Sequence, residues 1–163
     1  MLSHLNEKGE AKMVDVGGKQ PTERSAIAAC EIQIKTETLQ LLHSGRLKKG
    51  DAFTVAKIAG IQAAKKTAEL IPLCHLLPLE HIEILFFDLP YGDGVLIESR
   101  VDTTAKTGVE MEALTAAMIA ALTIYDMAKS YDPAMVITHL HLIRKSGGKH
   151  DYSVHQSRNF NSK

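Results

Sequence analysis

The sequence predicts an α+β fold, because segments with the two-residue period of β-strands alternate with segments that have the composition and end signals of helices. Its 163 residues and its 45% of hydrophobic residues suit one domain with a core of its own. We therefore expect a single domain over residues 1–163, with a flexible polar arm over residues 1–22 and a flexible polar tail over residues 150–163.

The first half of the chain predicts a strand followed by two helices. Over residues 26–34, apolar side chains alternate with polar ones, as in a half-buried strand. A short helix is expected over residues 36–45, where a threonine precedes the apolar run and a glycine follows it. Asp51 suits the N-cap of a longer helix, which we expect to run to about Leu70.

The second half predicts a hairpin, a helix and a last strand. Residues 79–89 and 94–104 are expected strands, joined by the turn signal "PYGDG" and therefore antiparallel. A long helix is expected over residues 109–131, because Pro133 cannot continue it. Residues 135–144 alternate again and predict a strand. This order is the split βαβ arrangement of a ferredoxin-like sandwich, in which the helices cover one face of an antiparallel sheet.

Both long helices carry unusually little charge. Between Asp51 and Ala64 the only charged residue is Lys57, and residues 113–125 carry no charge. A helix at the surface of a monomer should show a charged face. We therefore expect these helices to be covered a second time by another copy of the chain, which predicts an oligomer.

Charge and cysteine content argue against several classes of protein. The formal net charge is +0, which predicts no binding to nucleic acid or to an anionic membrane. Cys30 and Cys74 give no disulfide framework, and no apolar signal segment follows Met1, so a cytoplasmic protein is expected. The most apolar stretch, residues 113–125, is shorter than the ~20 residues of a spanning helix and carries two threonines, which predicts a buried helix.

Polar residues form one stripe along the last predicted helix. Asp126 and Lys129 lie one turn apart there, as a carboxylate base and an ammonium acid would. The alternative is a surface ion pair that contributes only about 0.2–0.5 kcal/mol. Glu110 and Glu112 open the same helix, where they could accept hydrogen bonds from the N–H groups of a guanine or pterin, or could serve only the helix dipole.

Lysines beside glycines predict a phosphate-bearing ligand. The segment "RLKKGD" contains Lys48 and Lys49, and "RKSGGK" contains Lys145 and Lys149. In both segments the backbone amides at the glycines can also reach an anion. For any one lysine the alternative is a solvated surface. Neither segment has the spacing of a P-loop, and the sequence contains no GxGxxG. An acidic and a basic pocket together would fit a purine nucleotide.

The stretch "ELIPLCHLLPL" is bracketed by two prolines, which predict a stiff loop that holds Cys74 and His75. His75 could act as a general acid or base, or could simply fill the loop. Together with His81 these two residues lack the spacing of a zinc site. His139 and His141 share a strand face but have no third ligand nearby in sequence, so we expect neither a metal nor a cofactor.

Four segments resemble, in order and at matching separations, the signature segments of the MoaC family, the cyclic pyranopterin monophosphate synthases: "GEAKMVDV", "RLKKGDAFTVAKIAGIQAAKKTAELIPLCH", "TGVEMEALTAAMIAALTIYDMAK" and "RKSGGK". The likeness spans residues 5–149. It implies a cytoplasmic lyase of molybdenum cofactor biosynthesis that converts (8S)-3′,8-cyclo-7,8-dihydroguanosine 5′-triphosphate to cyclic pyranopterin monophosphate and releases pyrophosphate. It also implies a ferredoxin-like homohexamer, a trimer of dimers with active sites at the dimer interface, whose substrate comes from a radical-SAM GTP cyclase.

The resemblance also implies roles for residues of this chain. As catalytic residues it implies Asp126, Lys49 and Lys129. As substrate-binding residues it implies Leu73, Cys74, His75, Met111, Glu112, Glu110, Lys65, Arg24 and Lys145. The chain departs from the family pattern at Leu76, where a proline commonly follows the histidine, and Pro78 restores part of the stiffness. A competing interpretation is a non-catalytic oligomeric nucleotide-sensing domain, because ferredoxin-like sandwiches often bind small molecules without catalysis.

Overall fold

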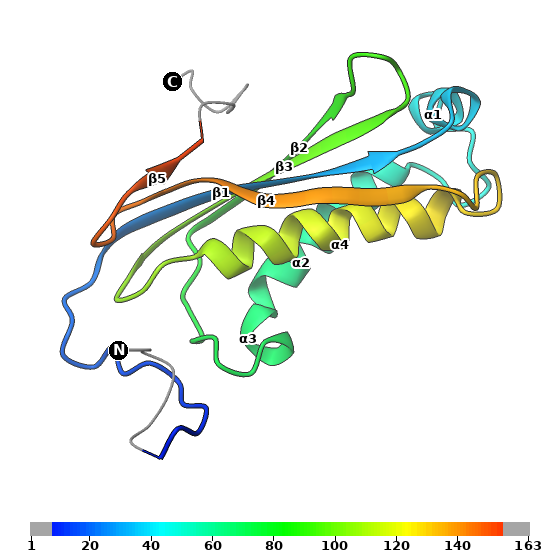
Figure 1. Cartoon of the computed structure of the whole chain (residues 1–163). Helices are drawn as coiled ribbons and strands as arrows, with labels where there is room; N and C mark the ends of the chain where they lie inside the picture. Colours follow the sequence, from blue (N-terminus) through cyan, green and yellow to red (C-terminus); the bar gives the residue numbers. More distant parts are fainter. Residues whose placement is uncertain (1–7, 155–163) are drawn as a thin grey trace.

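Five strands form one open antiparallel sheet in the order β2-β3-β1-β4-β5 (Figure 1). The computed structural model describes residues 8–154, and its strands are β1 (Thr22–Gln33), β2 (His81–Asp88), β3 (Gly94–Ala105), β4 (Val136–Ser146) and β5 (Tyr152–Ser153). Every neighbouring pair is antiparallel. The predicted α+β class and antiparallel sheet are therefore confirmed.

The two long helices lie on one face of this sheet. The helices of the described chain are α1 (Thr36–His43), α2 (Ala52–Lys65), α3 (Thr67–Leu70) and α4 (Glu110–Ala128). α2 and α4 pack against each other and against the strands, on the same side of the sheet in Figure 1. This is the placement that the sequence predicted. α4 is long and apolar enough to cross a membrane, but half of it is buried against the rest of the chain.

Small side chains let α4 lie close to the sheet. β1 turns Ala28 and Cys30 toward α4, and both are fully buried. α4 contributes a row of fully buried alanines: Ala113, Ala116, Ala117, Ala120 and Ala121. Cys30 Sγ donates a hydrogen bond to the Ala117 carbonyl at 3.4 Å, and the Ser99 hydroxyl donates to the Ala113 carbonyl at 2.6 Å. These contacts fix the direction of α4 and thereby the places of its two ends.

Gly60 lies where α2 crosses α4. A Cβ at this position would stand 2.8 Å from the Ala116 carbonyl oxygen and would also overlap the Ile84 side chain, so glycine permits the close crossing. Burial within one chain thus explains part of the apolar composition of these helices. Other apolar side chains of the two helices stay exposed, among them Val55, Ile58 and Leu122.

Two helices end earlier than the sequence predicted. The second helix does not run to Leu70, because the backbone breaks at Lys66 (φ −109°, ψ 8°) and separates α2 from the short α3. α4 ends at Ala128 rather than at residue 131. The backbone N–H groups of Tyr131 and Asp132 both donate to the Ala128 carbonyl, at 2.8 and 3.1 Å, which closes the helix in a turn.

Strand pairing decides where β1 begins and where β4 is irregular. β1 starts at Thr22, within the expected arm, because Thr22 is paired with Ala105 of β3. β4 does not alternate throughout: its register against β1 shifts twice, and His139 has φ 52°, as in a β-bulge. β5 lies within the expected tail. Residues 1–7 and 155–163 of the expected arm and tail are outside the described residues.

Short sequence signals predicted the cap of α2 and the hairpin turn correctly, and the cap of α1 incorrectly. Asp51 caps α2, because its Oδ1 accepts a hydrogen bond from the Thr54 N–H at 3.1 Å. The hairpin turn is closed by the N–H of Leu89, which donates to the carbonyl of Gly94 at 2.9 Å. The expected threonine cap of α1 is wrong: Lys35 occupies the N-cap, and within the described residues no side chain caps this helix.

Candidate active site

The proline loop between α3 and β2 is held at both ends. The Cys74 N–H donates to the Ile71 carbonyl at 3.0 Å, in a turn that follows α3. The Thr103 hydroxyl of β3 donates to the Pro78 carbonyl at 2.6 Å. Between these anchors, His75 Nε2 lies 2.8 Å from the Val14 carbonyl oxygen of the N-terminal arm. The stiff loop that the two prolines predicted therefore presents Cys74 and His75 from a fixed backbone.

This loop and the start of α4 enclose a cavity of about 350 Å³. Six of the predicted substrate-binding residues line it: Leu73, Cys74, His75, Glu110, Met111 and Glu112. Val14, Leu77, Thr107 and Gly108 complete the wall. We call this space the acidic cavity, because Glu110 and Glu112 are its two carboxylates.

Burial changes the proton affinity of two side chains in the acidic cavity. Glu112 is only 4% exposed, and this burial raises its pKa above the usual range, with a further contribution from the Glu110 charge. Burial also raises the pKa of the Cys74 thiol, and the Glu112 charge adds to this effect. Cys74 is therefore a protonated thiol rather than a nucleophilic thiolate. Glu112 can hold a proton or share one with a ligand nitrogen.

A second cavity, of about 230 Å³, lies beside the first and shares Thr107, Gly108 and Glu110 with it. We call it the basic cavity, because the following cationic side chains line it: Lys19, Arg24, Lys106, Lys145 and Lys149. Lys145 Nζ is 3.0 Å from Glu110 Oε1, so an ion pair stands at the boundary between the two cavities. The buried Nε of Arg24 has no hydrogen-bond partner within the described part of the chain. A bound anion would supply one.

Gly147 lies between Ser146 and Gly148, two residues that line the basic cavity. It adopts φ +84°, and a Cβ there would overlap the Glu23 carbonyl of β1. A side chain would therefore push the end of β4 away from β1. The Thr22 hydroxyl holds the loop in place by donating to the Gly147 carbonyl at 2.9 Å. The glycines of "RKSGGK" thus let Lys145 and Lys149 reach one cavity.

The predicted catalytic residues form a separate cluster at the other end of α4. Asp126 Oδ1 is 2.7 Å from Lys129 Nζ, and Asp126 Oδ2 is 2.9 Å from Lys49 Nζ. Lys49 Nζ also donates to the Asp126 carbonyl at 2.9 Å. Hydrogen bonds from Lys129, which has the larger effect, and from Lys49 lower the pKa of Asp126 to about 2. The Asp126 carboxylate in turn raises the pKa of Lys129. At neutral pH this Asp126 cluster is one carboxylate between two ammonium groups.

The structure does not bring the Asp126 cluster and the cavities together within one chain. Asp126 lies fourteen positions after Glu112, which at about 1.5 Å per residue places them roughly 21 Å apart along α4. The two ends of α4 are correspondingly far apart in Figure 1. Lys65, in the last turn of α2, is exposed and lines neither cavity as the described residues form them.

Comparison with known proteins shows the family of this chain. Residues 13–148 match the MoaC family. The chain belongs to the MoaC family. It is 55% identical to the cyclic pyranopterin monophosphate synthase of Pelotomaculum thermopropionicum, over 91% of this chain and 87% of that protein. The proteins of the same name from Chloroflexus aggregans and Thermomicrobium roseum are 55% and 52% identical, over 91% of this chain and 90% and 89% of theirs.

Eleven of the twelve residues that the MoaC-family resemblance selected fall into the three places described above. Six line the acidic cavity, Arg24 and Lys145 line the basic cavity, and three form the Asp126 cluster. Their individual roles stay predictions. Within residues 8–154, no group of three or more histidine, cysteine or carboxylate side chains is arranged to hold a metal ion.

The sequence did not single out Val14 and Lys106, which line the two cavities of the candidate site. Val14 lies 61 positions before His75 and reaches it through a backbone carbonyl, which no residue type reveals. Lys106 lies in the connection between β3 and α4 and donates to the Gly17 carbonyl at 2.8 Å. One signal was available: the segment "MVDV", which carries part of the family resemblance, contains Val14.

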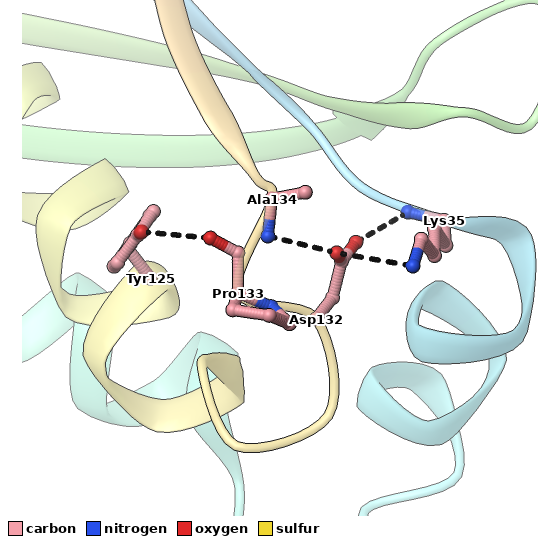
Figure 2. A network of polar contacts seen from close by, with 5 residues as sticks. All are labelled: Lys35, Tyr125, Asp132, Pro133 and Ala134. Carbon is pink, nitrogen blue, oxygen red and sulfur yellow. Dashed lines mark hydrogen bonds and ion pairs between the residues drawn. The ribbon is translucent and has the colours of Figure 1, made fainter.

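A polar network fixes the segment that follows the Asp126 cluster (Figure 2). Asp132 is 1% exposed, and its carboxylate accepts hydrogen bonds from the backbone N–H of Lys35 at 2.9 Å and of Ala134 at 3.2 Å. The Tyr125 hydroxyl donates to the Pro133 carbonyl at 3.2 Å. These bonds tie the loop after α4 to the end of β1, so the C-terminal end of α4 has a fixed setting.

Proposed function

We propose that this protein converts (8S)-3′,8-cyclo-7,8-dihydroguanosine 5′-triphosphate to cyclic pyranopterin monophosphate with release of pyrophosphate, in molybdenum cofactor biosynthesis. The observation that carries the proposal is the pair of adjoining cavities, one acidic and one basic, lined by residues of the MoaC-family segments. The substrate has the same two parts, a modified guanine and a triphosphate. The curated relatives named above bear the name of this activity.

The acidic cavity suits the guanine part of the substrate. Glu110 and Glu112 can accept hydrogen bonds from its amino and ring N–H groups. Leu73 and Met111 supply apolar contact for the flat base. Glu112 lies in a nearly dry place, where a hydrogen bond to the base discriminates more strongly than it would in water.

The basic cavity suits the triphosphate. Formation of the cyclic phosphate requires a substrate hydroxyl oxygen to bond to the α-phosphorus while the bond to the β-phosphate oxygen breaks. Negative charge then grows on the departing pyrophosphate. Arg24, Lys145 and Lys149 are placed to neutralise this charge, and preorganised donors of this kind are among the largest contributors to catalysis.

We assign proton transfer during ring rebuilding to the Asp126 cluster. The pairing lowers the pKa of Asp126 to about 2 and raises that of Lys129, so a bound substrate must first part the pair. The carboxylate can then accept a proton, and a lysine ammonium group can donate one. Each well-placed proton transfer contributes about 10²–10⁴-fold to the rate. Because the cluster lies far from the cavities of its own chain, we propose that it serves the cavities of a neighbouring copy.

This assignment requires a homo-oligomer, and we propose the homohexamer that the family resemblance implies. The exposed apolar side chains of α2 and α4, such as Val55 and Leu122, suit an interface between chains. We also propose that the fold is ferredoxin-like, because the order β2-β3-β1-β4 with helices between β1 and β2 and between β3 and β4 agrees with it. A cytoplasmic setting and a radical-SAM cyclase that supplies the substrate belong to the same proposal.

The experiment is to give the purified protein the cyclised triphosphate without the radical-SAM enzyme, and to follow pyrophosphate and the fluorescent oxidised pterin. Product from the wild type is expected, with a loss of about 10²-fold or more in Lys49→Ala, because one charged donor of the cluster is gone. Lys57→Ala, which removes an exposed lysine of α2 outside the cluster, should keep the wild-type rate. Tight binding without product would favour the sensing domain instead.

A further inference from the structure

We propose that His75 exchanges protons with the substrate through its Nδ1 atom, and that the N-terminal arm selects this atom by holding Nε2–H on the Val14 carbonyl. The inference rests on the proposed function, because it concerns how a residue of that site acts. It assigns a role to the arm, which sequence reasoning left as a mobile segment.

The contact between His75 and Val14 fixes which ring nitrogen carries hydrogen. A backbone carbonyl oxygen can only accept a hydrogen bond, so His75 Nε2, at 2.8 Å from the Val14 oxygen, must be the donor. In a neutral imidazole the other nitrogen then has a free lone pair. Nδ1 has no hydrogen-bond partner within the described residues. It is therefore the nitrogen that can take a proton.

The Val14 carbonyl is itself held in place by its own segment. The Gly17 carbonyl, three residues further on, accepts a hydrogen bond from Lys106 Nζ at 2.8 Å. Between these points the Gly17 N–H donates to Asp15 Oδ1 at 2.7 Å, which closes a tight Asx turn. The arm is thus attached to the rest of the site at two points, His75 and Lys106. We call residues 14–17 the strap.

The strap also contributes to the cavity that the ring lines. Val14 and His75 both lie in the wall of the acidic cavity, and Lys106 lines the basic one. When Nδ1 accepts a proton from a substrate N–H or O–H, the ring becomes an imidazolium that still donates from Nε2. The Val14 carbonyl stabilises that cation, because a hydrogen bond to a charged donor is stronger than one to a neutral donor. The same ring can then return the proton.

The tautomer can be measured without any turnover. In the full-length protein labelled with ¹⁵N at its eight histidines, long-range ¹H–¹⁵N spectra in alkaline buffer should show His75 with hydrogen on Nε2 and a bare Nδ1. The signal is assigned by its loss in His75→Gln, and His43→Gln serves as the matched control because His43 pairs with Asp88 away from both cavities. Hydrogen on Nδ1 would overturn the inference.

Two amide variants separate the strap contact from the chemistry. His75→Gln places an N–H near the position of Nε2 and keeps the strap contact, whereas His75→Asn places its amide near Nδ1 and loses it. Both should lower kcat by about 10²-fold or more, and only His75→Asn should also raise KM several-fold. A wild-type kcat in His75→Gln would contradict the inference. An inactive wild-type protein would instead refute the proposed function. The NMR measurement of the His75 tautomer would still show whether Nε2 donates to the strap.

Discussion

The Asp126 carboxylate is paired with the ammonium groups of Lys49 and Lys129, and its pKa depends directly on these two contacts. In the wild type its carboxyl group should titrate with a pKa of about 2, below the ordinary 3.8, and Lys49→Ala should raise that value. Since the folded pKa is the lower one, the pairing favours the fold above about pH 4, and its contribution is lost as the pH falls through about 2. NMR titration of the side-chain carboxyl carbon measures the shift.

The control for this titration is Lys57→Ala, which should leave the Asp126 pKa unchanged. An ordinary pKa for Asp126 in the wild type would mean that the cluster does not form in solution. In that case the two lysines would be independent surface charges, and the assignment of proton transfer to this cluster would lose its physical basis.

At the level of single residues, the sequence predicted those features that depend on the residue type and on residues close by in sequence. The spacing of Asp126 and Lys129 predicted their pairing, and the two prolines predicted the loop at His75. The family resemblance named Lys49 and Asp126 as catalytic residues, but their contact across 77 positions was not predicted, because no local pattern indicates it. The contact of Val14 with His75 was missed because a backbone carbonyl has no signature in residue type.

The loop after α4 depends on one buried carboxylate, and its removal should weaken the fold. Asp132→Ala would leave the backbone N–H groups of Lys35 and Ala134 without their acceptor (Figure 2). Because these two bonds are only partly buried, we expect the free energy of unfolding to fall by about 1–3 kcal/mol in total. Urea denaturation at a fixed protein concentration measures the change.

The matched control for this network is Lys35→Ala. Its backbone N–H stays bonded to Asp132, and only a side chain that is 62% exposed, with Nζ 3.9 Å from the carboxylate, is removed. The free energy of unfolding should change by less than about 0.5 kcal/mol. Equal losses in Asp132→Ala and Lys35→Ala would show that the exposed ion pair, rather than the backbone bonds, holds the loop.

Some ends of helices and strands are set by residues nearby in sequence, and others are set by contacts with residues far away in sequence. Asp51 caps α2 through Thr54, three residues away, so the sequence predicted it. β1 begins at Thr22 because β3 continues alongside it to Ala105, and Lys35, the N-cap residue of α1, is held by its backbone N–H, which donates to Asp132. Neither partner is near in sequence, so propensity alone could not place these ends.

The two cavities of the molecule differ in charge although its formal net charge is +0. Glu110 and Glu112 line the acidic cavity, whereas four lysines and Arg24 outnumber the shared Glu110 in the basic one. The composition hid this separation, because a balanced total contains no information about position. The apolar long helices predict an oligomer, and this stays a prediction. It agrees with the proposed function, in which the Asp126 cluster serves another chain because the acidic cavity of its own chain lies about 21 Å away along α4.

The central claim is that one active site is built from two chains, and paired variants test it most directly. Chains with Lys49→Ala and chains with His75→Gln, carrying different affinity tags, are co-expressed, and the mixed oligomers are purified through both tags. Each variant alone should be inactive. In the mixture, random pairing should restore about one site in four, because Lys49 of one chain meets His75 of the other. Mixed oligomers as inactive as either variant alone would contradict the account.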